Sequence, residues 1–398
     1  MKQKRVLILG ASRYYSRSIN AARNAGYYVI AADRNPGAEG FAAADLGVTC
    51  DIVDRDAVLS IARQQLIDAI VPVNDYGVPT AAYVAARLGI PGISEGAALL
   101  ATDKQAMRER WSSTGVPCPT VAVATTPSDF ERAIEKVGYP CILKPAHGIG
   151  GASRGVVVVE KPSELRDAIS FSQSFYPDKT TLVESFVESD IEHSAEVIID
   201  QGKPHVIAIS DKVKTALPYR VDKSVVYPTC VGPAQRELLI GAIESSVRAL
   251  GLKVGAAHVE LATTKNGPVL FELGARCGGG GTPEPIVHFS TGVDEFVETV
   301  RTLAGDKPEN LVPTRDNGCV YQFLTPAPGQ IKSVSGVEEV RRRAGILDVE
   351  VFVRPGEVIQ PVTIGTQRAG FLIAGAPSRE SAITLAHEAE AAITFQYD

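Results

Sequence analysis

Two glutamates, Glu260 and Glu272, stand at equal distances on either side of Asn266, in a stretch whose alternating apolar residues predict two short strands. If Lys265, Asn266 and Gly267 form a three-residue hairpin loop, with Gly267 in the left-handed conformation, the two glutamates face each other. A two-residue turn at Asn266 and Gly267 would place them on opposite faces. Facing carboxylates roughly 5 Å apart destabilise a sheet unless a cation lies between them. The sequence therefore predicts a Mg²⁺ site, and two solvent-facing glutamates are the simpler alternative.

The residues after Glu272 add a cation and flexible backbone to the same region. Arg276 follows four positions later, and a run of four glycines occupies residues 278–281. Thr282 and Pro283 predict a helix start, with Thr282 as the N-cap and Pro283 at the first helical position. Such a start would direct free N–H groups at this region, so we expect an anion to bind here.

Length and charge limit the classes of partner. The chain has 398 residues, which is too long for one compact core and suits two or three domains. Hydrophobic residues make up 45% and charged residues 22%, as in globular proteins. The net charge of -6 argues against nucleic acid as the main partner, since no basic run exceeds the three arginines at 341–343. We expect small-molecule ligands instead.

Cysteine spacing and hydropathy bear on the compartment. The six cysteines show no C-x-x-C spacing, and no charged-then-apolar secretory leader opens the chain. We therefore expect free thiols in a reducing cytoplasm. No apolar run approaches the roughly 20 residues that span a bilayer, so the sequence predicts no membrane partner.

Residues 1–97 are predicted to form a doubly wound parallel α/β domain, because buried-strand runs alternate with helices. The expected strands lie at 5–10, 27–33 and 68–73, and the expected helices at 16–25 and 78–88.

This start imitates a dinucleotide-binding fingerprint, since a strand ends at Gly10 and the acidic Asp33 follows about 20 residues later. The second and third glycines of the fingerprint are absent, and Arg13, Tyr14 and Tyr15 would crowd a pyrophosphate on that backbone. The pattern therefore disfavours a nicotinamide enzyme. We expect Asp33 to be a strand-end turn residue or a substrate contact.

Residues 98–312 are predicted to form the middle domain, with a mobile lid subdomain at about 120–188. A loop at 146–155 joins two expected strands and contains four glycines, one serine and one arginine. This composition lets several backbone N–H groups turn toward an anion, with Lys144 at the base of the loop. A plain mobile hairpin loop is the alternative, and the Walker A pattern is absent.

Acidic residues follow the expected strand at 181–187. Carboxylates of this acidic cluster would accept hydrogen bonds from an adenine amino group and from ribose hydroxyls. Solvated turn residues are the alternative. Lys212 and Lys214 either add a cationic side to this cleft or are surface charges.

Residues 313–398 are predicted to form a smaller α+β domain without obvious chemistry. Its expected role is to close one side of the cleft, and a homodimer contact is a second role. Strands are expected at 320–324, 349–353, 358–364 and 369–374, and helices at 336–344 and 380–392.

Five short motifs follow one another along the chain: Lys104, Ile-Leu-Lys144-Pro with its glycine loop, Val-Glu184-x-x-Val187, His258-Val-Glu260 and Phe-Glu272-Leu-Gly-Ala-Arg276. In this order they resemble the ATP-grasp superfamily of carboxylate-amine ligases. The resemblance covers essentially the whole chain. It implies a leading α/β domain, a two-part nucleotide clamp and a trailing domain, as in the purine-synthesis, biotin carboxylase and L-amino-acid ligase branches.

The resemblance also implies roles for individual residues. Mg²⁺ or Mn²⁺ would bind Glu260 and Glu272, in agreement with the hairpin argument. Arg276 and Lys144 would act in catalysis, with Arg276 beside the tetrahedral intermediate. The loop at 147–154 would cover the phosphates, Glu184 and Val187 would contact adenine, and Glu192 the ribose. The implied ATP-binding residues are Lys104, Lys144, His147, Gly150, Gly151, Ser153, Glu184, Phe186, Val187, Glu192 and Lys212.

Gly274 departs from the pattern of the superfamily, and His258 has two alternative roles. Gly274 stands where many members of the superfamily have Asn, so a third metal ligand is absent or replaced by water, as the L-amino-acid ligases tolerate. His258 lies two residues before Glu260 and hence on the same face of the strand. The sequence leaves open whether His258 is a catalytic residue or a core histidine.

The implied activity joins a small carboxylate, activated by ATP as an acyl phosphate, to an amine. An amino acid is the expected carboxylate. A purine-pathway ligase for glycine or formate is the main alternative, with Arg13, Arg34 and Arg315 as candidate phosphate ligands. Carbamoyl phosphate or biotin carboxylase chemistry ranks lower. A nucleotide-binding module without turnover is disfavoured, because it has little use for two metal carboxylates and an arginine.

Overall fold

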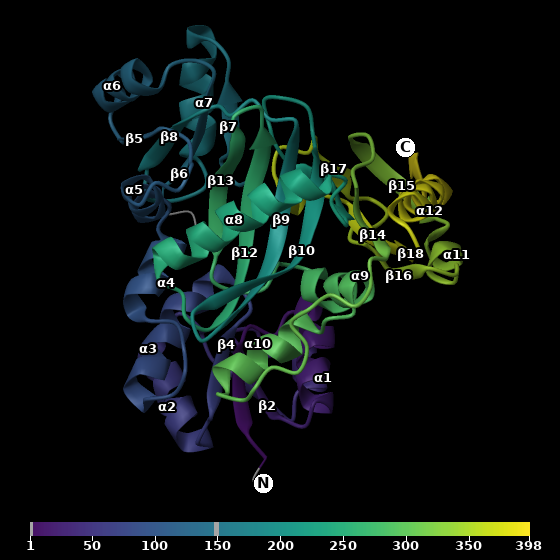
Figure 1. Cartoon of the computed structure of the whole chain (residues 1–398). Helices are drawn as coiled ribbons and strands as arrows, with labels where there is room; N and C mark the ends of the chain where they lie inside the picture. Colours follow the sequence, from purple (N-terminus) through teal and green to yellow (C-terminus); the bar gives the residue numbers. More distant parts are fainter. Residues whose placement is uncertain (1–2, 147–150) are drawn as a thin grey trace.

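The computed structural model describes residues 3–146 and 151–398, and Figure 1 shows their arrangement. A parallel α/β layer lies at the N-terminal end, a large antiparallel sheet occupies the centre, and a small subdomain projects on either side of that sheet. Within the described residues, no helix has the length and apolarity needed to cross a membrane.

Four strands within residues 3–97 form a parallel sheet in the order β3-β2-β1-β4. Helices α1 and α10 pack on one face of this sheet and α2 and α3 on the other, which confirms the predicted doubly wound fold. The strands are β1 (Arg5–Leu9), β2 (Tyr28–Asp33), β3 (Leu46–Thr49) and β4 (Ala69–Pro72). The helices are α1 (Ser16–Asn24), α2 (Arg55–Gln65), α3 (Val78–Leu88) and α10 (Glu295–Leu303).

Two helices lead from this layer to a subdomain built around the antiparallel sheet β5-β8-β6-β7, whose strands fall within 121–146 and 151–185. This segment lies inside the range expected for the lid, whose mobility stays a prediction. The connecting helices are α4 (Glu95–Thr102) and α5 (Lys104–Ser113). The subdomain contains β5 (Val121–Ala124), α6 (Pro127–Val137), β6 (Cys141–Pro145), β7 (Val157–Val159), α7 (Leu165–Ser172) and β8 (Thr181–Ser185).

Eight strands of residues 151–398 form the central sheet, in the order β13-β12-β9-β10-β11-β14-β18-β16. The sheet continues across the domain boundary expected at residue 312, because β14 pairs with both β11 and β18. Helix α8 (Pro233–Leu250) packs on one of its faces. The strands are β9 (Ile191–Asp200), β10 (Lys203–Lys214), β11 (Asp222–Tyr227), β12 (Gly255–Thr264), β13 (Gly267–Gly274), β14 (Gly318–Leu324), β16 (Ile346–Val351) and β18 (Gly370–Ala376).

The last part of the chain differs from expectation at the strand expected over 358–364, and it contains two strands, β15 (Gly329–Ser335) and β19 (Thr394–Tyr397), that were not predicted. Instead of a strand over 358–364, the structure has the short β17 (Val358–Ile359) and a 3-10 turn, η6 (Gly365–Gln367). Strand β17 pairs with β15, which also pairs with β19. Helix α12 (Arg379–Ala392) packs on β14 and β18, and α11 (Val337–Arg341) lies beside it.

The helix start expected at Thr282 is also wrong in detail. The chain forms a π-helical turn, η5 (Thr282–Val287), before α9 (His288–Thr291), and Gly281 occupies the N-cap position. The Thr282 hydroxyl donates to the Gly279 carbonyl at 2.7 Å, so it bonds to the preceding glycine run and does not cap a helix.

Trp111 joins α5 to the central sheet and offers a test of the packing. Its side chain is fully buried, and its indole N–H donates to the Ser246 carbonyl on α8 at 3.3 Å. We expect Trp111→Ala to lower the free energy of unfolding by about 3–5 kcal/mol, because a large buried ring leaves a cavity. Urea unfolding followed by circular dichroism measures this loss. Leu99→Ala, at a side chain that is 60% exposed, should change the free energy of unfolding little. Equal losses in the two variants would contradict the buried packing of Trp111.

Candidate active site

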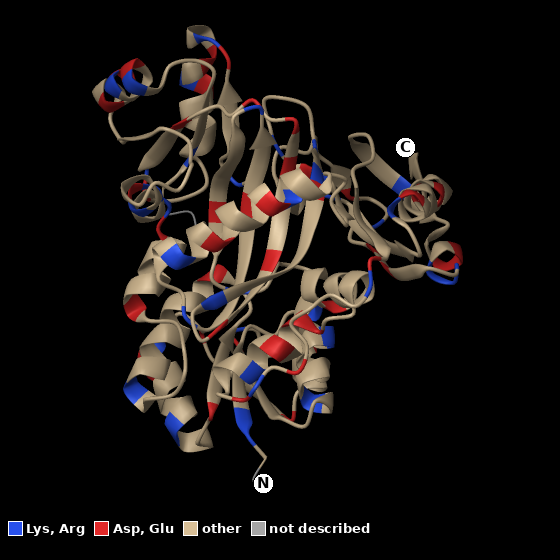
Figure 2. Ribbon diagram, viewed as in Figure 1, with Lys and Arg blue, Asp and Glu red and all other residues tan. Residues whose placement is uncertain are grey.

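A cavity of about 640 Å³ lies between the parallel layer, the β5–β8 subdomain and the central sheet. Basic and acidic residues both occur on the strands of that sheet (Figure 2). Most of the predicted site residues line the cavity: Lys104, Lys144, Gly151, Ser153, Glu184, Phe186, Val187, Glu192, His258, Glu260, Glu272 and Arg276. Lys212 contacts Glu260, while His147 and Gly150 lie outside the described residues.

The alternation of side chains along a strand separates the two faces of the central sheet. On β9, Ala195, Val197 and Ile199 belong to the core beneath α8. Glu192 and Glu196 occupy alternate positions of the same strand, where Glu192 lines the cavity and Glu196 contacts His258 in its wall. At the cavity, the sheet therefore has an apolar face toward α8 and a polar face toward the ligand space.

Glu260 on β12 and Glu272 on β13 are paired directly opposite each other. The predicted pairing is thus observed, but the predicted three-residue loop is not. Thr264 pairs with Gly267, which leaves a two-residue turn, and the register shifts between Glu260 and Leu261, where Phe271 has no partner. With a two-residue turn alone, the two glutamates would lie on opposite faces. The β-bulge adds one residue to β13, so both glutamates lie on the same face.

Each of these carboxylates is neutralised by a lysine from another element. Lys104, the first residue of α5, lies 2.5 Å from Glu272, and Lys212 on β10 lies 2.5 Å from Glu260. Burial alone would raise the pKa of Glu260, but the ammonium groups of Lys212 and Lys214 and a hydrogen bond from His258 lower it well below its usual range. The ionised donor set of two facing carboxylates fits a hard divalent cation.

A second group of ion pairs lies toward β8. The Glu184 carboxylate is 3% exposed and accepts from Arg108 at 2.8 Å and from Lys144 at 2.7 Å. Burial lowers the pKa of Lys144, and the attraction of Glu184 only partly offsets this effect. Glu192 pairs with Arg220 and, at 3.3 Å, with Lys214. The adenine and ribose contacts of Glu184 and Glu192 stay predictions.

Arg276 is held by a residue that the sequence did not single out. Its Nε and Nη2 each donate to one oxygen of the Asp75 carboxylate at 2.9 Å, and Asp75 begins the short turn η3 (Asp75–Gly77) at the carboxyl end of β4. The carboxyl ends of parallel strands often carry ligand-binding residues, which is the signal that was available. A Cβ at Gly274 would lie 2.9 Å from Asp75 Oδ1, so a side chain at this position, where many members of the superfamily have Asn, would displace the contact between Asp75 and Arg276.

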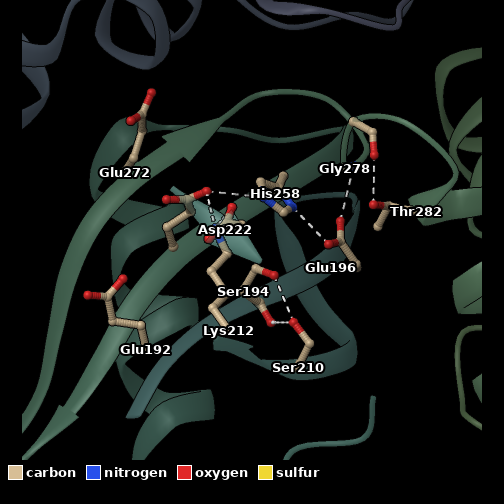
Figure 3. Close-up of polar contacts among 12 residues, drawn as sticks. Glu192, Ser194, Glu196, Ser210, Lys212, Asp222, His258, Glu272, Gly278 and Thr282 are labelled. Carbon is tan, nitrogen blue, oxygen red and sulfur yellow. Dashed lines mark hydrogen bonds and ion pairs between the residues drawn. The ribbon is translucent and has the colours of Figure 1, made fainter. Parts of the chain in front are cut away.

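His258 is connected to the glycine run through Glu196, as Figure 3 shows. The fully buried Glu196 lies 2.7 Å from His258 Nδ1 and accepts from the Gly278 N–H at 3.1 Å. Burial alone would lower the pKa of His258, but the Glu196 carboxylate raises it to about 9. His258 Nε2 lies 3.7 Å from Glu260. His258 thus lies between Glu196 and Glu260 at the cavity, and its catalytic role stays a prediction.

Comparisons with known proteins agree with this site. An ATP-grasp domain model matches residues 137–284, and a model of the L-amino acid ligase C-terminal domain 2 matches residues 322–398. The chain thus contains an ATP-grasp domain. Its trailing part is of the L-amino acid ligase type.

Individual relatives are similar over most of the chain. The L-arginine-specific L-amino acid ligase of Bacillus subtilis is 26% identical over 78% of this chain and 76% of that protein. Protein y4rH of Sinorhizobium fredii is 26% identical over 78% of this chain, which spans 64% of the length of y4rH. The crystal structure of an L-amino acid ligase from Bacillus licheniformis has a TM-score of 0.83 at 23% identity, with 100% of both chains covered. That likeness shows the fold.

The Asp75 pair predicts a pH-dependent contribution to stability. Burial would raise the pKa of Asp75, but Arg276 lowers it below its usual value. A lowered pKa stabilises the fold above the unfolded-state value of about 3.9, and this contribution disappears as the pH falls through the folded-state value. We expect Asp75→Asn to cost about 3 kcal/mol at pH 7, because a buried guanidinium loses its counter-charge.

Urea unfolding at a series of pH values measures this prediction. The difference between the wild type and Asp75→Asn should narrow below about pH 4. Asp348→Asn is the control, because Asp348 pairs with Arg17 at 3.3 Å on the surface and should matter little. If the difference in the free energy of unfolding between the wild type and Asp75→Asn stayed constant down to pH 2, the ion pair of Asp75 with Arg276 would not be its cause.

Proposed function

We propose that the protein is an ATP-dependent ligase that activates a small carboxylate as an acyl phosphate and joins it to an amine. An amino acid is the proposed carboxylate. The observation that carries the proposal is the facing pair Glu260 and Glu272, with Arg276 in the same cavity. The matched ATP-grasp and L-amino acid ligase models and the Bacillus subtilis relative support the substrate class.

The residues of the cavity fit ATP and a divalent cation. Glu260 and Glu272 offer oxygen ligands, and Mg²⁺ or Mn²⁺ bound there would neutralise charge on the transferring phosphoryl group. Lys104 and Lys212 already lie against these carboxylates, so both ammonium groups are placed to bind phosphate oxygens beside them. Lys144 adds a third cation on the β6 side.

The chemistry needs no protein nucleophile. The substrate carboxylate attacks the γ-phosphorus, the bond to ADP breaks, and an acyl phosphate forms. The amine nitrogen then attacks the acyl carbon, the C–N bond forms, and inorganic phosphate leaves with the electron pair while the amine loses a proton. Arg276, fixed by Asp75, supplies positive charge for the tetrahedral intermediate.

The described half of the glycine loop contacts two other parts of the cavity wall. The Ser153 hydroxyl donates to the Arg220 carbonyl at 3.2 Å, and the Ala152 carbonyl accepts from the Gly365 N–H at 2.7 Å. These contacts bring the loop, the start of β11 and the C-terminal segment together. Exclusion of water by this segment would protect the acyl phosphate from hydrolysis.

A phosphoribosyl substrate is the second candidate, as in the purine-pathway alternative. The phosphoribosylglycinamide synthetase of Anaerococcus prevotii shares the fold, with a TM-score of 0.76 at 20% identity over 100% of both chains. Arg13, Arg34 and Arg315 were the candidate phosphate ligands. Of these, Arg13 already pairs with Glu350, and its guanidinium lies 4.5 Å from the centre of the Phe352 ring. Because Arg13 is already engaged by these contacts, they favour an amino-acid substrate over a phosphoribosyl substrate.

Replacement of Glu272 by Gln tests the proposal. We expect ADP release that depends on the substrate carboxylate to fall at least about hundredfold, because a metal ligand contributes several kcal/mol to transition-state stabilisation. A coupled ADP assay over a panel of amino acids with MgATP measures this. Glu244→Gln, which removes a surface ion pair with Arg248 at 2.7 Å, is the control. Equal turnover of the two folded variants would overturn the metal assignment.

A further inference from the structure

Five aromatic rings form one end of the cavity, and we call them the aromatic wall. Tyr14 comes from the turn η1 (Arg13–Tyr15), Tyr321 and Phe323 from β14, Phe352 from the segment after β16, and Phe371 from β18. Each ring centre lies between 4.4 and 6.2 Å from that of a neighbour. Tyr14, Phe323 and Phe352 remain partly exposed, so the wall presents apolar surface to the cavity.

Arg368 lies beside this wall with unused hydrogen-bonding capacity. Its guanidinium stacks on Phe323 at 3.6 Å from the ring centre, and Nη2 donates to the Asp222 carbonyl at 2.8 Å. The buried Nε has no hydrogen-bond partner among the described residues, and no carboxylate of residues 3–146 or 151–398 forms an ion pair with this arginine. A planar cation of this kind binds carboxylates.

The wall is continuous with the reacting end of the cavity. Arg276 lies at the beginning of the glycine run, and a Cβ added to Gly280 would lie 2.8 Å from the Tyr321 hydroxyl. After Cys277, whose side chain is buried in the core of the parallel layer, the glycines therefore lead to the wall without side chains of their own. Arg368 also lies near the metal carboxylates, because Asp222 is 3.6 Å from Lys212, the partner of Glu260.

These positions match the three groups on one carbon of an α-amino acid. We propose that this end of the cavity binds the amine-bearing substrate, and that this substrate is an α-amino acid with a large apolar, preferably aromatic, side chain. Arg368 binds its carboxylate, the aromatic wall receives its side chain, and its amine points along the glycine run toward Arg276. The inference rests on the proposed function.

Charge and shape favour this substrate class over others. The five rings carry no carboxylate for a basic side chain, and the acids around them are engaged: Glu350 pairs with Arg13, Asp348 with Arg17, and Asp222 with Lys212 and Lys214. Aromatic rings contribute contact area and edge-to-face geometry that a small or acidic side chain does not use. The nucleobase is expected near Phe186 and Val187, on the opposite side of the cavity floor.

The first experiment uses the unmodified protein. The activated carboxylate is identified with hydroxylamine as the amine, by detection of the hydroxamate. The amine is then varied with MgATP and that carboxylate at saturation, using L-phenylalanine, L-leucine, L-alanine, L-lysine, L-aspartate and phenethylamine. We expect the highest kcat/KM for L-phenylalanine, and a KM for phenethylamine at least about tenfold higher, because it lacks the charge-assisted contact with Arg368.

The second experiment compares Arg368→Gln with the matched control Arg87→Gln, whose guanidinium also lies 3.6 Å over a ring, that of Tyr83, but outside the cavity. Arg368→Gln should raise the KM for L-phenylalanine about tenfold and leave that for phenethylamine unchanged. Phe323→Leu should reduce the preference for L-phenylalanine over L-leucine. Arg87→Gln should change neither.

The outcomes separate this inference from the proposed function. If no carboxylate gives hydroxamate or ADP, the proposed function fails. If hydroxamate forms but a small or charged amine is preferred, or if Arg368→Gln raises only the KM for ATP, the assignment of this end of the cavity is overturned. If Arg368→Gln does not fold, the comparison of L-phenylalanine with phenethylamine on the wild type decides the same question.

Discussion

The electrostatic pairing of two facing carboxylates with two lysines is the constraint on which the rest of the structure depends. Glu260 and Glu272 would repel each other across β12 and β13 if Lys104 and Lys212 did not neutralise them. The lysines come from α5 and β10, so the charge balance joins separate parts of the chain at one point. A cation and a triphosphate can replace the ammonium groups without leaving either carboxylate unpaired.

The surrounding architecture keeps this point polar and fixed. The apolar face of the central sheet packs on α8, which leaves the charged face for the cavity. Asp75 reaches Arg276 from the parallel layer, and Glu196 fixes both His258 and the glycine run. Each of these acids is engaged by a donor from another segment, so the geometry of the site follows from the packing of all parts of the chain.

The sequence predicted those elements whose signal is local. The alternating strands and helices of the first 97 residues and the facing glutamates were visible in the spacing of apolar and acidic residues. The predicted length of the loop between the glutamates was wrong. The observed two-residue turn is compensated by a bulge at Phe271, and nothing in the composition distinguishes that residue from a regular strand residue.

Tertiary contacts account for what the sequence did not reveal. Asp75 and Arg276 are 201 positions apart, and nothing in either local pattern indicates the other. The C-terminal segment was predicted to lack chemistry, since Phe323 and Arg368 read as an ordinary strand residue and a loop residue. They acquire a role only because β14 and β18 extend the central sheet to the cavity.

The assignment of Glu260 and Glu272 as metal ligands is best tested by a crystal structure with ADP and Mg²⁺ bound. If the assignment holds, both glutamates coordinate the cation, and Lys104 and Lys212 have moved from the carboxylates to the nucleotide phosphates. A cation bound elsewhere, with both lysine–glutamate pairs intact, would contradict it.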